Sequence, residues 1–321
     1  MNEFDFIRQY LCNKQKDGNV LLGIGDDAAI VRPSLDMDWC ISSDMLLAGR
    51  HFFTDTAAED IAHKVLAVNL SDMAAMGATP KWVLLSAALP ELNPVWLKSF
   101  CNQFFSLCGE YGISLIGGDT TKGNLAFNVT IIGEVPKGSG LRRSGAAVGD
   151  DIWVSGRLGL AAAALEHLSG KYLLPPGTAK ICLPCLLRPQ PRVALGRVML
   201  GMAHAAQDVS DGLAQDLGHI LCASKVGGQI YLQDLPTLPE LAESLPSEIL
   251  ARHMLSGGDD YELVFTAPPG KRYEIIAAAE KAETAVSRIG KIMAGSGLEI
   301  FDSDGRPIYL KKGGFDHFSD G

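Results

Sequence analysis

Short apolar runs alternate with stretches of helical spacing along this chain of 321 residues. In the first half, strands are predicted at 20–24, 39–43, 82–89, 113–117 and 125–135, and helices at 57–76 and 94–111. A second series begins with a strand at 152–156 and a helix at 158–168. Further helices are predicted at 191–203, from 211 and near 238–253, and further strands at 229–233 and 261–266. The pair Asp304-Gly305 predicts a hairpin turn. This order of elements indicates an α/β or α+β fold.

A polar, glycine-rich stretch, PKGSGLRRSGAAVGDD, separates the two series. With 47% hydrophobic residues, the chain holds enough apolar material for two ordinary cores. We therefore expect an N-terminal domain at 1–146 and a C-terminal domain at 147–321.

Net charge and hydropathy exclude several classes of partner. The formal charge of −9 argues against a sequence-independent grip on nucleic acid, which needs a basic surface. No stretch approaches the roughly 18 uninterrupted apolar residues of a membrane span, and the N-terminus MNEFDFIRQY lacks the features of a signal peptide. We expect a cytoplasmic protein without a membrane or nucleic-acid partner.

The seven cysteines are odd in number and irregularly spaced, which favours reduced thiols over a disulfide framework. Cys182 and Cys185 form one CxxC pair within the apolar segment ICLPCLL. A zinc site would need a second pair of ligands, so buried structural thiols are the default interpretation.

Six apolar runs end in small residues followed by aspartate, an arrangement that places carboxylates at the mouth of a core. They are LLGIGDD at Asp26 and Asp27, WCISSD at Asp44, LAVNLSD at Asp72, SLIGGD at Asp119, AQDVSD at Asp208 and Asp211, and MLSGGDD at Asp259 and Asp260. Converging carboxylates repel one another and resist burial unless cations are present. The pattern therefore predicts several divalent ions, and the neighbouring glycines suit loops that curl around phosphates.

Two of these aspartates are placed more closely by helical arithmetic. Asp72 lies about 20° from Ile61 around the axis of the helix at 57–76, so it points toward the protein, where a salt bridge or a metal ion would neutralise it. Asp211 or Ser210 can cap the following run GLAQDLGHI, which leaves a cap alone as the alternative for Asp211.

Familiar catalytic and nucleotide motifs are missing. The sequence contains no GxxxxGK[ST], EF-hand, GxSxG or HExxH motif. GIGDDA at 23–28 matches the loose dinucleotide pattern, but Pro33 follows too soon for a helix and the paired aspartates would repel a pyrophosphate.

Eight segments resemble the thiamine-monophosphate kinase family, in order and at matching spacing across nearly the whole chain. They are GIGDDAAIV, SSDMLLAGRHF, AVNLSDMAAMGATP, LIGGDTTKG, RSGAAVGDDIWVSG, DVSDGLAQDLGHI, LSGGDDYEL and the terminal GFDHF. The resemblance implies the two-domain α+β fold of aminoimidazole ribonucleotide synthetase, with N-terminal domains that pair in a homodimer. It also implies that ATP lies in a cleft that the C-terminal domain completes.

The resemblance also assigns roles to individual residues. It implies Mg²⁺ ligands at Asp27, Ser42, Ser43, Asp44, Asp72, Asp119, Asp208 and Asp211, with Asp26 close behind them. It implies ATP contacts at Tyr111, Gly118, Asp119, Arg143 and Ser210, and contacts with thiamine monophosphate at His51, Asp260 and Phe315.

The chemistry of the implied substrate fits the missing motifs. Thiamine monophosphate ends in a phosphate whose second pKa is about 6, so its oxygen is an anionic nucleophile near neutral pH and needs no general base. Two unit charges about 4 Å apart repel by roughly 4 kcal/mol at an effective dielectric of 20, so Mg²⁺ must offset the repulsion between ATP and its acceptor. We expect direct in-line transfer of the γ-phosphoryl group.

Two other interpretations remain. A chain of this fold could activate an amide oxygen with ATP or make selenophosphate, although Cys12 in YLCNKQ does not resemble a selenium-handling loop. A non-catalytic nucleotide- or metal-binding module is the third possibility.

Overall fold

The computed structural model describes residues 3–12, 17–25, 27–310 and 314–315, so Asp26 and part of GFDHF lie outside the described residues. The chain forms two compact units. The N-terminal unit comprises residues 1–73 and 78–138, and the C-terminal unit comprises residues 74–77 and 139–321.

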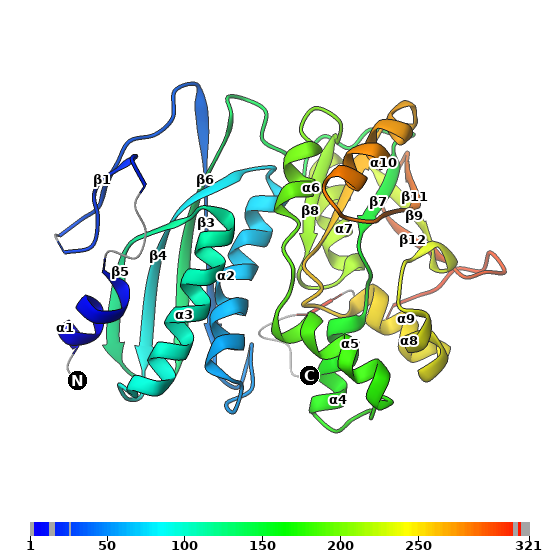
Figure 1. Ribbon diagram of the computed structural model, residues 1–321. Helices are drawn as coiled ribbons and strands as arrows, with labels where there is room; N and C mark the ends of the chain where they lie inside the picture. Colours follow the sequence, from blue (N-terminus) through cyan, green and yellow to red (C-terminus); the bar gives the residue numbers. More distant parts are fainter. Residues whose placement is uncertain (1–2, 13–16, 26, 311–313, 316–321) are drawn as a thin grey trace. The chain divides into compact units, whose positions relative to one another are not determined.

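The N-terminal unit is built on a four-stranded sheet that two long helices cover on one face (Figure 1). Across the sheet the strands are β3 (Met37–Leu47), β6 (Ala126–Pro136), β4 (Thr79–Leu89) and β5 (Ser114–Lys122). The β4–β5 pair is parallel, and β6 is antiparallel to both β3 and β4. The covering helices are α2 (Ala58–Ala75) and α3 (Pro94–Tyr111).

The smaller elements of this unit lie near its N-terminus. They are α1 (Glu3–Phe6), a π-helical turn (Ile7–Leu11), and β1 (Val20–Leu22), which pairs antiparallel with β2 (Ile30–Val31).

Helix α3 shows how local sequence fixes an element. The side chain of Asn93 accepts the backbone N–H groups of Val95 and Trp96, and Pro94 occupies the first turn. Gly112 ends the helix in the left-handed conformation, with φ 65°. These local signals are visible in the sequence, and the predicted helix at 94–111 is confirmed.

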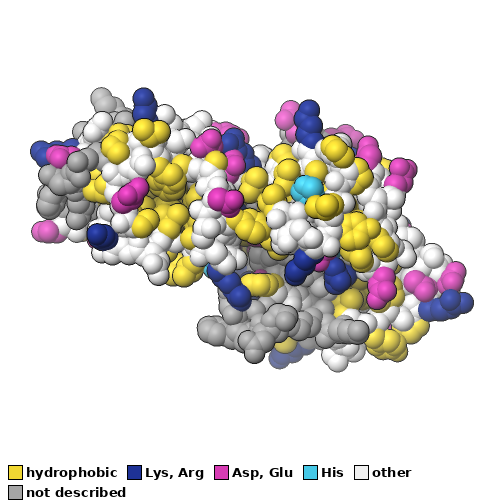
Figure 2. Space-filling model, turned by 90° about the horizontal axis from the view of Figure 1, so that it is seen from below, with side chains coloured by type: hydrophobic (Ala, Val, Ile, Leu, Met, Phe, Trp, Pro, Cys, Tyr) yellow, Lys and Arg dark blue, Asp and Glu magenta, His cyan; other side chains and the backbone are white. Residues whose placement is uncertain are grey.

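Strand β3 lies at an edge of the sheet, and its side chains alternate between two environments. Cys40 and Leu46 are buried toward the helices. The opposite face is open and apolar, with exposed Met37, Trp39, Ile41, Met45 and Leu47. Hydrophobic side chains at the surface, with charged ones among them, are also visible on the face shown in Figure 2.

The C-terminal unit has a six-stranded sheet, antiparallel except for its β12–β9 pair. Across the sheet the strands are β12 (Gly297–Phe301), β9 (Gly227–Tyr231), β11 (Val286–Met293), β7 (Asp151–Ser155), β10 (Glu262–Ala267) and β8 (Ala205–Val209). Helix α7 (Leu213–Ser224) packs on it through a core that includes Leu217, Ile220 and Val264.

A second apolar cluster in this unit is helical. It joins α4 (Leu160–Leu168), α5 (Pro176–Leu187), α8 (Pro239–Ser244) and α9 (Ser247–Ser256). The remaining elements are α6 (Val193–Val198), α10 (Arg272–Lys281) and the 3₁₀ turns Leu232–Asp234 and Pro269–Lys271.

Several sequence predictions are corrected here. The helix predicted at 238–253 is two helices, because Pro246 interrupts it, and the helix predicted at 191–203 is limited to α6. Elements α5, β8, α10 and β11 were not predicted. The Asp304-Gly305 turn is confirmed, since Gly305 N–H donates to the Asp302 carbonyl and Phe301 bridges Pro307. None of the helices in the described part of the chain has the length and apolar character that a membrane crossing requires.

Candidate active site

Three of the residues implied as metal ligands lie together in the N-terminal unit, where β3 faces α2. Ser42 Oγ donates to Asp72 Oδ2 at 2.5 Å. The Asp44 N–H donates to Asn69 Oδ1 of the same helix at 3.2 Å. Asn69 is in turn held by the Val65 carbonyl. Asp72 is half-buried and points toward the sheet, as its position on the helix predicts.

Ser43 and Asp119 lie on the opposite, open face of the same sheet. Ser43 Oγ contacts Asn128 and Thr130 across β6. Asp119 pairs with Ser86, and Ser86 pairs with Asn128, so Asp119 shares this face. Three strand spacings, about 14 Å, separate β5 from β3. Within this unit the fold therefore does not bring Asp44 and Asp119 together.

Gly118 precedes Asp119 at a point of close backbone approach. Its φ is +149°, and a Cβ there would lie 1.8 Å from the Leu85 carbonyl oxygen. Glycine is thus required by the packing of β5 against β4.

His51 has a defined tautomer. Its Nδ1 accepts the Leu47 N–H at 3.0 Å, so the proton of the neutral ring is on Nε2, and Lys64 Nζ donates to the His51 carbonyl at 3.1 Å. Asp27 is exposed beyond β1, and Tyr111 is the last residue of α3.

In the C-terminal unit Asp208 lies in β8, and the turn between β8 and α7 carries Ser210 and Asp211. The prediction that Ser210 or Asp211 caps α7 is wrong, because Gly212 is the N-cap and makes no side-chain bond. Instead, Asp216 Oδ2 accepts the N–H groups of residues 210, 211 and 212 at 3.0, 3.1 and 3.1 Å. Sequence reasoning missed Asp216, although an acidic residue in the first turn was a usable signal.

The loop 257–261 is fixed against this turn. Asp259 N–H donates to the Ser210 carbonyl and Tyr261 N–H to the Val209 carbonyl, both at 2.8 Å. Asp259 and Tyr261 have positive φ, 66° and 49°, which is uncommon for residues other than glycine. The Tyr261 hydroxyl also donates to Asp259 Oδ1.

Asp260 and Phe315 adjoin these segments. The Asp260 carboxylate accepts the Gly159 N–H at 3.0 and 3.2 Å, and burial raises the pKa of Asp260 well above its ordinary value. Phe315 N–H donates to the Asp211 carbonyl at 3.0 Å. The Arg143 carbonyl accepts from Ser224 at the far end of α7, about 18 Å along the helix from the turn. Its guanidinium reaches closer, because the charges of Arg143 and Asp211 both act on His219.

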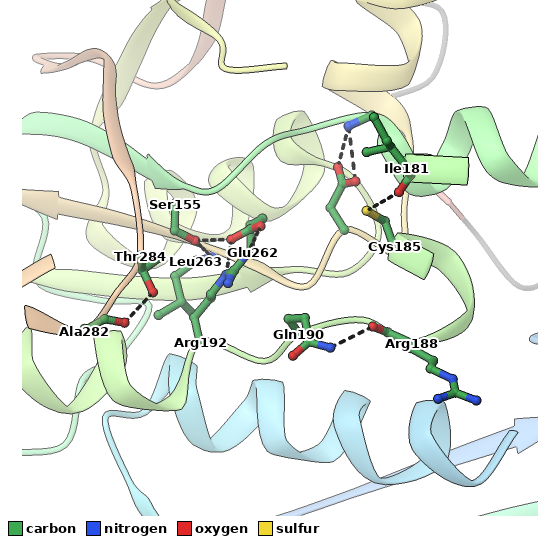
Figure 3. A network of polar contacts seen from close by, with 12 residues as sticks. Ser155, Ile181, Cys185, Arg188, Gln190, Arg192, Glu262, Leu263, Ala282 and Thr284 are labelled. Atoms are coloured by element: carbon green, nitrogen blue, oxygen red, sulfur yellow. Dashed lines mark hydrogen bonds and ion pairs between the residues drawn. The ribbon is translucent and has the colours of Figure 1, made fainter. Parts of the chain in front are cut away.

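A partly buried ion pair supports the start of β10, two residues after Asp260 (Figure 3). Arg192 makes two bonds to the Glu262 carboxylate, at 2.6 and 2.5 Å, and Ser155 Oγ donates to the same carboxylate at 2.5 Å. Sequence reasoning missed this network. Burial raises the pKa of Cys182 to about 12 and also raises the pKa of nearby Cys185. Cys182 is buried as expected, whereas Cys185 is only partly buried.

Comparison with known proteins decides the family. Residues 25–135 match "AIR synthase related protein, N-terminal domain" and residues 147–303 match "AIR synthase related protein, C-terminal domain". The thiamine-monophosphate kinase of Escherichia coli K12 is 41% identical over 319 residues, which is 99% of this chain and 98% of that protein. The Haemophilus influenzae enzyme is 39% identical over 100% of this chain and 99% of its own length.

The chain belongs to the thiamine-monophosphate kinase family.

Solved structures of the family share the fold. The crystal structure of thiamine-monophosphate kinase from Stenotrophomonas maltophilia K279a has a TM-score of 0.87 at 42% identity and covers 96% of this chain and 98% of that chain. The structure described as "AaThiL complexed with AMPPCP and TMP" has a TM-score of 0.76 at 30% identity and covers 92% of each chain. The hydrogenase maturation protein HypE, at 19% identity and a TM-score of 0.78, shares the fold alone.

The donors in the described part of the chain include oxygen atoms suited to Mg²⁺. In the described ranges, no three His, Cys, Asp or Glu side chains come close enough to hold a metal ion. The cluster of Ser42, Asp44 and Asp72 nevertheless presents hydroxyl and carboxylate oxygens, the hard donors that Mg²⁺ prefers. The chemistry of this donor set therefore fits Mg²⁺.

Proposed function

We propose that this chain phosphorylates thiamine monophosphate with ATP to give thiamine diphosphate and ADP. The observation that carries the proposal is the relative with 30% identity that was crystallised with AMPPCP and TMP and that aligns with 92% of this chain. AMPPCP is a methylene analogue of ATP, so that pair represents the two substrates of the transfer.

The proposed reaction needs positioning more than acid–base chemistry. The acceptor phosphate is already anionic near neutral pH, so its oxygen can attack the γ-phosphorus in line while ADP leaves. The protein's task is to align two polyanions and to exclude water from the transfer. No side chain is assigned as a general base.

We assign Mg²⁺ ligands to Asp27, Ser42, Ser43, Asp44, Asp72, Asp119, Asp208 and Asp211. Bound Mg²⁺ would offset the phosphate charges of both substrates. The Ser42–Asp72 bond supports the assignment, because it holds the carboxylate of Asp72 beside the strand that carries Asp44.

We assign ATP contacts to Tyr111, Gly118, Asp119, Arg143 and Ser210, and contacts with thiamine monophosphate to His51, Asp260 and Phe315. Two observations support the second group. His51 has a fixed tautomer, and Phe315 is tied through its backbone to Asp211. In this proposal the domain at 1–146 binds ATP and Mg²⁺, and the domain at 147–321 completes the cleft.

A homodimer formed through the N-terminal domains belongs to the same proposal. The open face of β3 exposes five large apolar side chains, and a second copy would remove them from water. Ser43 and Asp119 lie on this open side of the sheet, so the partner would also cover polar groups assigned to the active site. A cytoplasmic location is consistent with seven free cysteines.

The direct test is to incubate the purified protein with Mg²⁺, ATP and thiamine monophosphate and to measure thiamine diphosphate by chromatography. Thiamine without its phosphate is the control acceptor and should give no product. ATP hydrolysis that does not depend on thiamine monophosphate, with no thiamine diphosphate formed, would refute the proposal. Rapid quench with γ-labelled ATP should reveal no phosphorylated protein, and a competent phospho-enzyme would refute direct transfer.

A further inference from the structure

Asp216 is a buried carboxylate that the assigned functions do not use. Its side chain is 1% exposed, although it lies in the first turn of α7. Oδ2 accepts three consecutive backbone N–H groups, and Oδ1 accepts the Gln207 side-chain amide at 2.8 Å. His219 Nδ1 lies 3.8 Å from Oδ1. Every one of the three backbone groups belongs to the turn at 210–212.

This turn is held from a second side by the loop before β10. The Ser210 carbonyl accepts the Asp259 N–H at 2.8 Å. Gly212 has φ +127°, and a Cβ there would lie 2.9 Å from the carbonyl carbon of Ser256. The end of α9 therefore limits movement of the turn on that side.

The side chains that precede α7 do not cap it. A helix start normally takes its cap from a Ser or Asp at the preceding positions. Here the N-cap is Gly212, and Asp216 instead accepts the N–H groups of the turn before the helix. The Asp211 carboxylate accepts the Gln215 side-chain amide at 3.0 Å. Asp216 therefore fixes the backbone of the turn from inside the helix.

Burying a carboxylate is costly unless polar groups of the protein replace the lost water. Here the carboxylate is 1% exposed, and its hydrogen bonds go to the turn and to Gln207. The buried charge therefore serves the turn at 210–212.

We propose that Asp216 is a positioning residue for nucleotide binding, since it fixes the turn 210–212 that presents Ser210 and Asp211. The inference rests on the proposed function of those two residues. Asp216 itself does not touch the substrates. Loss of its carboxylate leaves the three turn amides without this acceptor, so Ser210 and Asp211 are held less firmly.

The test compares Asp216→Leu, Asp216→Asn and the control Asp151→Asn. Leucine removes all four hydrogen bonds, whereas asparagine can still accept the three amides through Oδ1. The asparagine amide can donate to Gln207 Oε1, a buried atom without a hydrogen-bond partner in the described part of the chain. Asp151 is also fully buried in this unit, but its partner is Arg272, so its loss destabilises the unit without touching the turn.

Affinity for AMPPCP in the presence of Mg²⁺ is measured by calorimetry, together with the thermal midpoint, kcat and both KM values. We expect Asp216→Leu to raise the Kd of AMPPCP at least 10-fold. Asp216→Asn should stay within threefold of wild type, and Asp151→Asn within twofold despite a lower midpoint. If Asp216→Leu is insoluble, Asp216→Glu, which displaces the carboxylate by one methylene, takes its place with the same expectation.

Equal AMPPCP affinity in Asp216→Leu and Asp151→Asn would overturn the inference, because Asp216 would then be only structural. A wild-type protein that binds AMPPCP but makes no thiamine diphosphate would refute the proposed function and leave the binding comparison decisive for Asp216. A wild-type protein that does not bind AMPPCP would refute both.

Discussion

The hydroxyl of Ser42 and the carboxylate of Asp72 are 2.5 Å apart, so a residue of β3 and a residue of α2 share a hydrogen bond at the proposed metal cluster. Asp72→Asn keeps an oxygen that can accept this bond but removes the charge. We expect kcat to fall by about 100-fold or more, because the lost charge is one that the transition state requires.

The matched control is Asp55→Asn, an exposed acidic residue of the same unit, which should leave kcat within twofold. Steady-state kinetics at several Mg²⁺ concentrations and a thermal midpoint check both variants. Wild-type turnover by Asp72→Asn at limiting Mg²⁺ would contradict the metal assignment.

Gly118 in β5 and Gly123 just beyond it should differ in their tolerance of alanine. Alanine at 118 would place its Cβ 1.8 Å from the Leu85 carbonyl oxygen at φ +149°, which only glycine adopts readily. We expect Gly118→Ala to destabilise the N-terminal unit by about 1–3 kcal/mol or more. Gly123→Ala should be tolerated, since its Cβ would meet only Ala88 Cβ at 3.4 Å. Urea unfolding of both variants gives the comparison, and equal midpoints would contradict the packing argument.

Ile41 is the most exposed apolar residue on the open face of β3, at 62%. Ile41→Glu should convert the proposed dimer to monomers, because a charge would be buried at the interface without a partner. Val95→Glu is the control, since Val95 is 80% exposed at the start of α3 and does not belong to that face. Light scattering after gel filtration measures both. A wild-type monomer, or a dimer that survives Ile41→Glu, would rule out this surface as the interface.

The buried His253 side chain should lower the stability of the folded state at acidic pH. Burial lowers the pKa of His253 below 6.5, although the Glu166 bond acts in the opposite direction. The unfolded chain therefore binds a proton near pH 6.5 that the folded chain does not, and the folded state loses stability as the pH falls below that value.

His253→Gln removes this titration and can still donate to Glu166. Its thermal midpoint should therefore fall less between pH 7.5 and 5.5 than that of wild type. Identical decreases in the two proteins would show that His253 does not contribute to acid instability.

The sequence predicted elements best where local signals agreed. Helix α3 has a capping Asn93, Pro94 in its first turn and Gly112 beyond its end, so its bounds were readable. Helix α5 was missed because Pro175, Pro176 and Pro184 suggest a loop, although two of them precede or open the helix and the third is accommodated within it. Strand β11 was missed because Arg288 and Lys291 interrupt its apolar pattern.

In the candidate site, the sequence predicted features within one strand or helix but not the pairing between elements. The inward direction of Asp72 followed from helical periodicity and agrees with the structure. Which face of the sheet carries Asp119 depends on the register of β5 against β4, including a bulge between Val83 and Leu84, and no local pattern encodes that register. The role of Asp216 under the turn at 210–212 likewise arises from tertiary packing.

The alternation along β3 also governs how this strand can vary in length. Ser42 faces α2, whereas its neighbour Ser43 faces the open side. One residue inserted between Ser43 and Asp44 would exchange the faces of every later position, unless a bulge absorbed it. Asp44 would then face the open side, and Met45 would face the helices. Natural or engineered insertions should therefore fall in the loops that flank β3, or enter the strand two at a time.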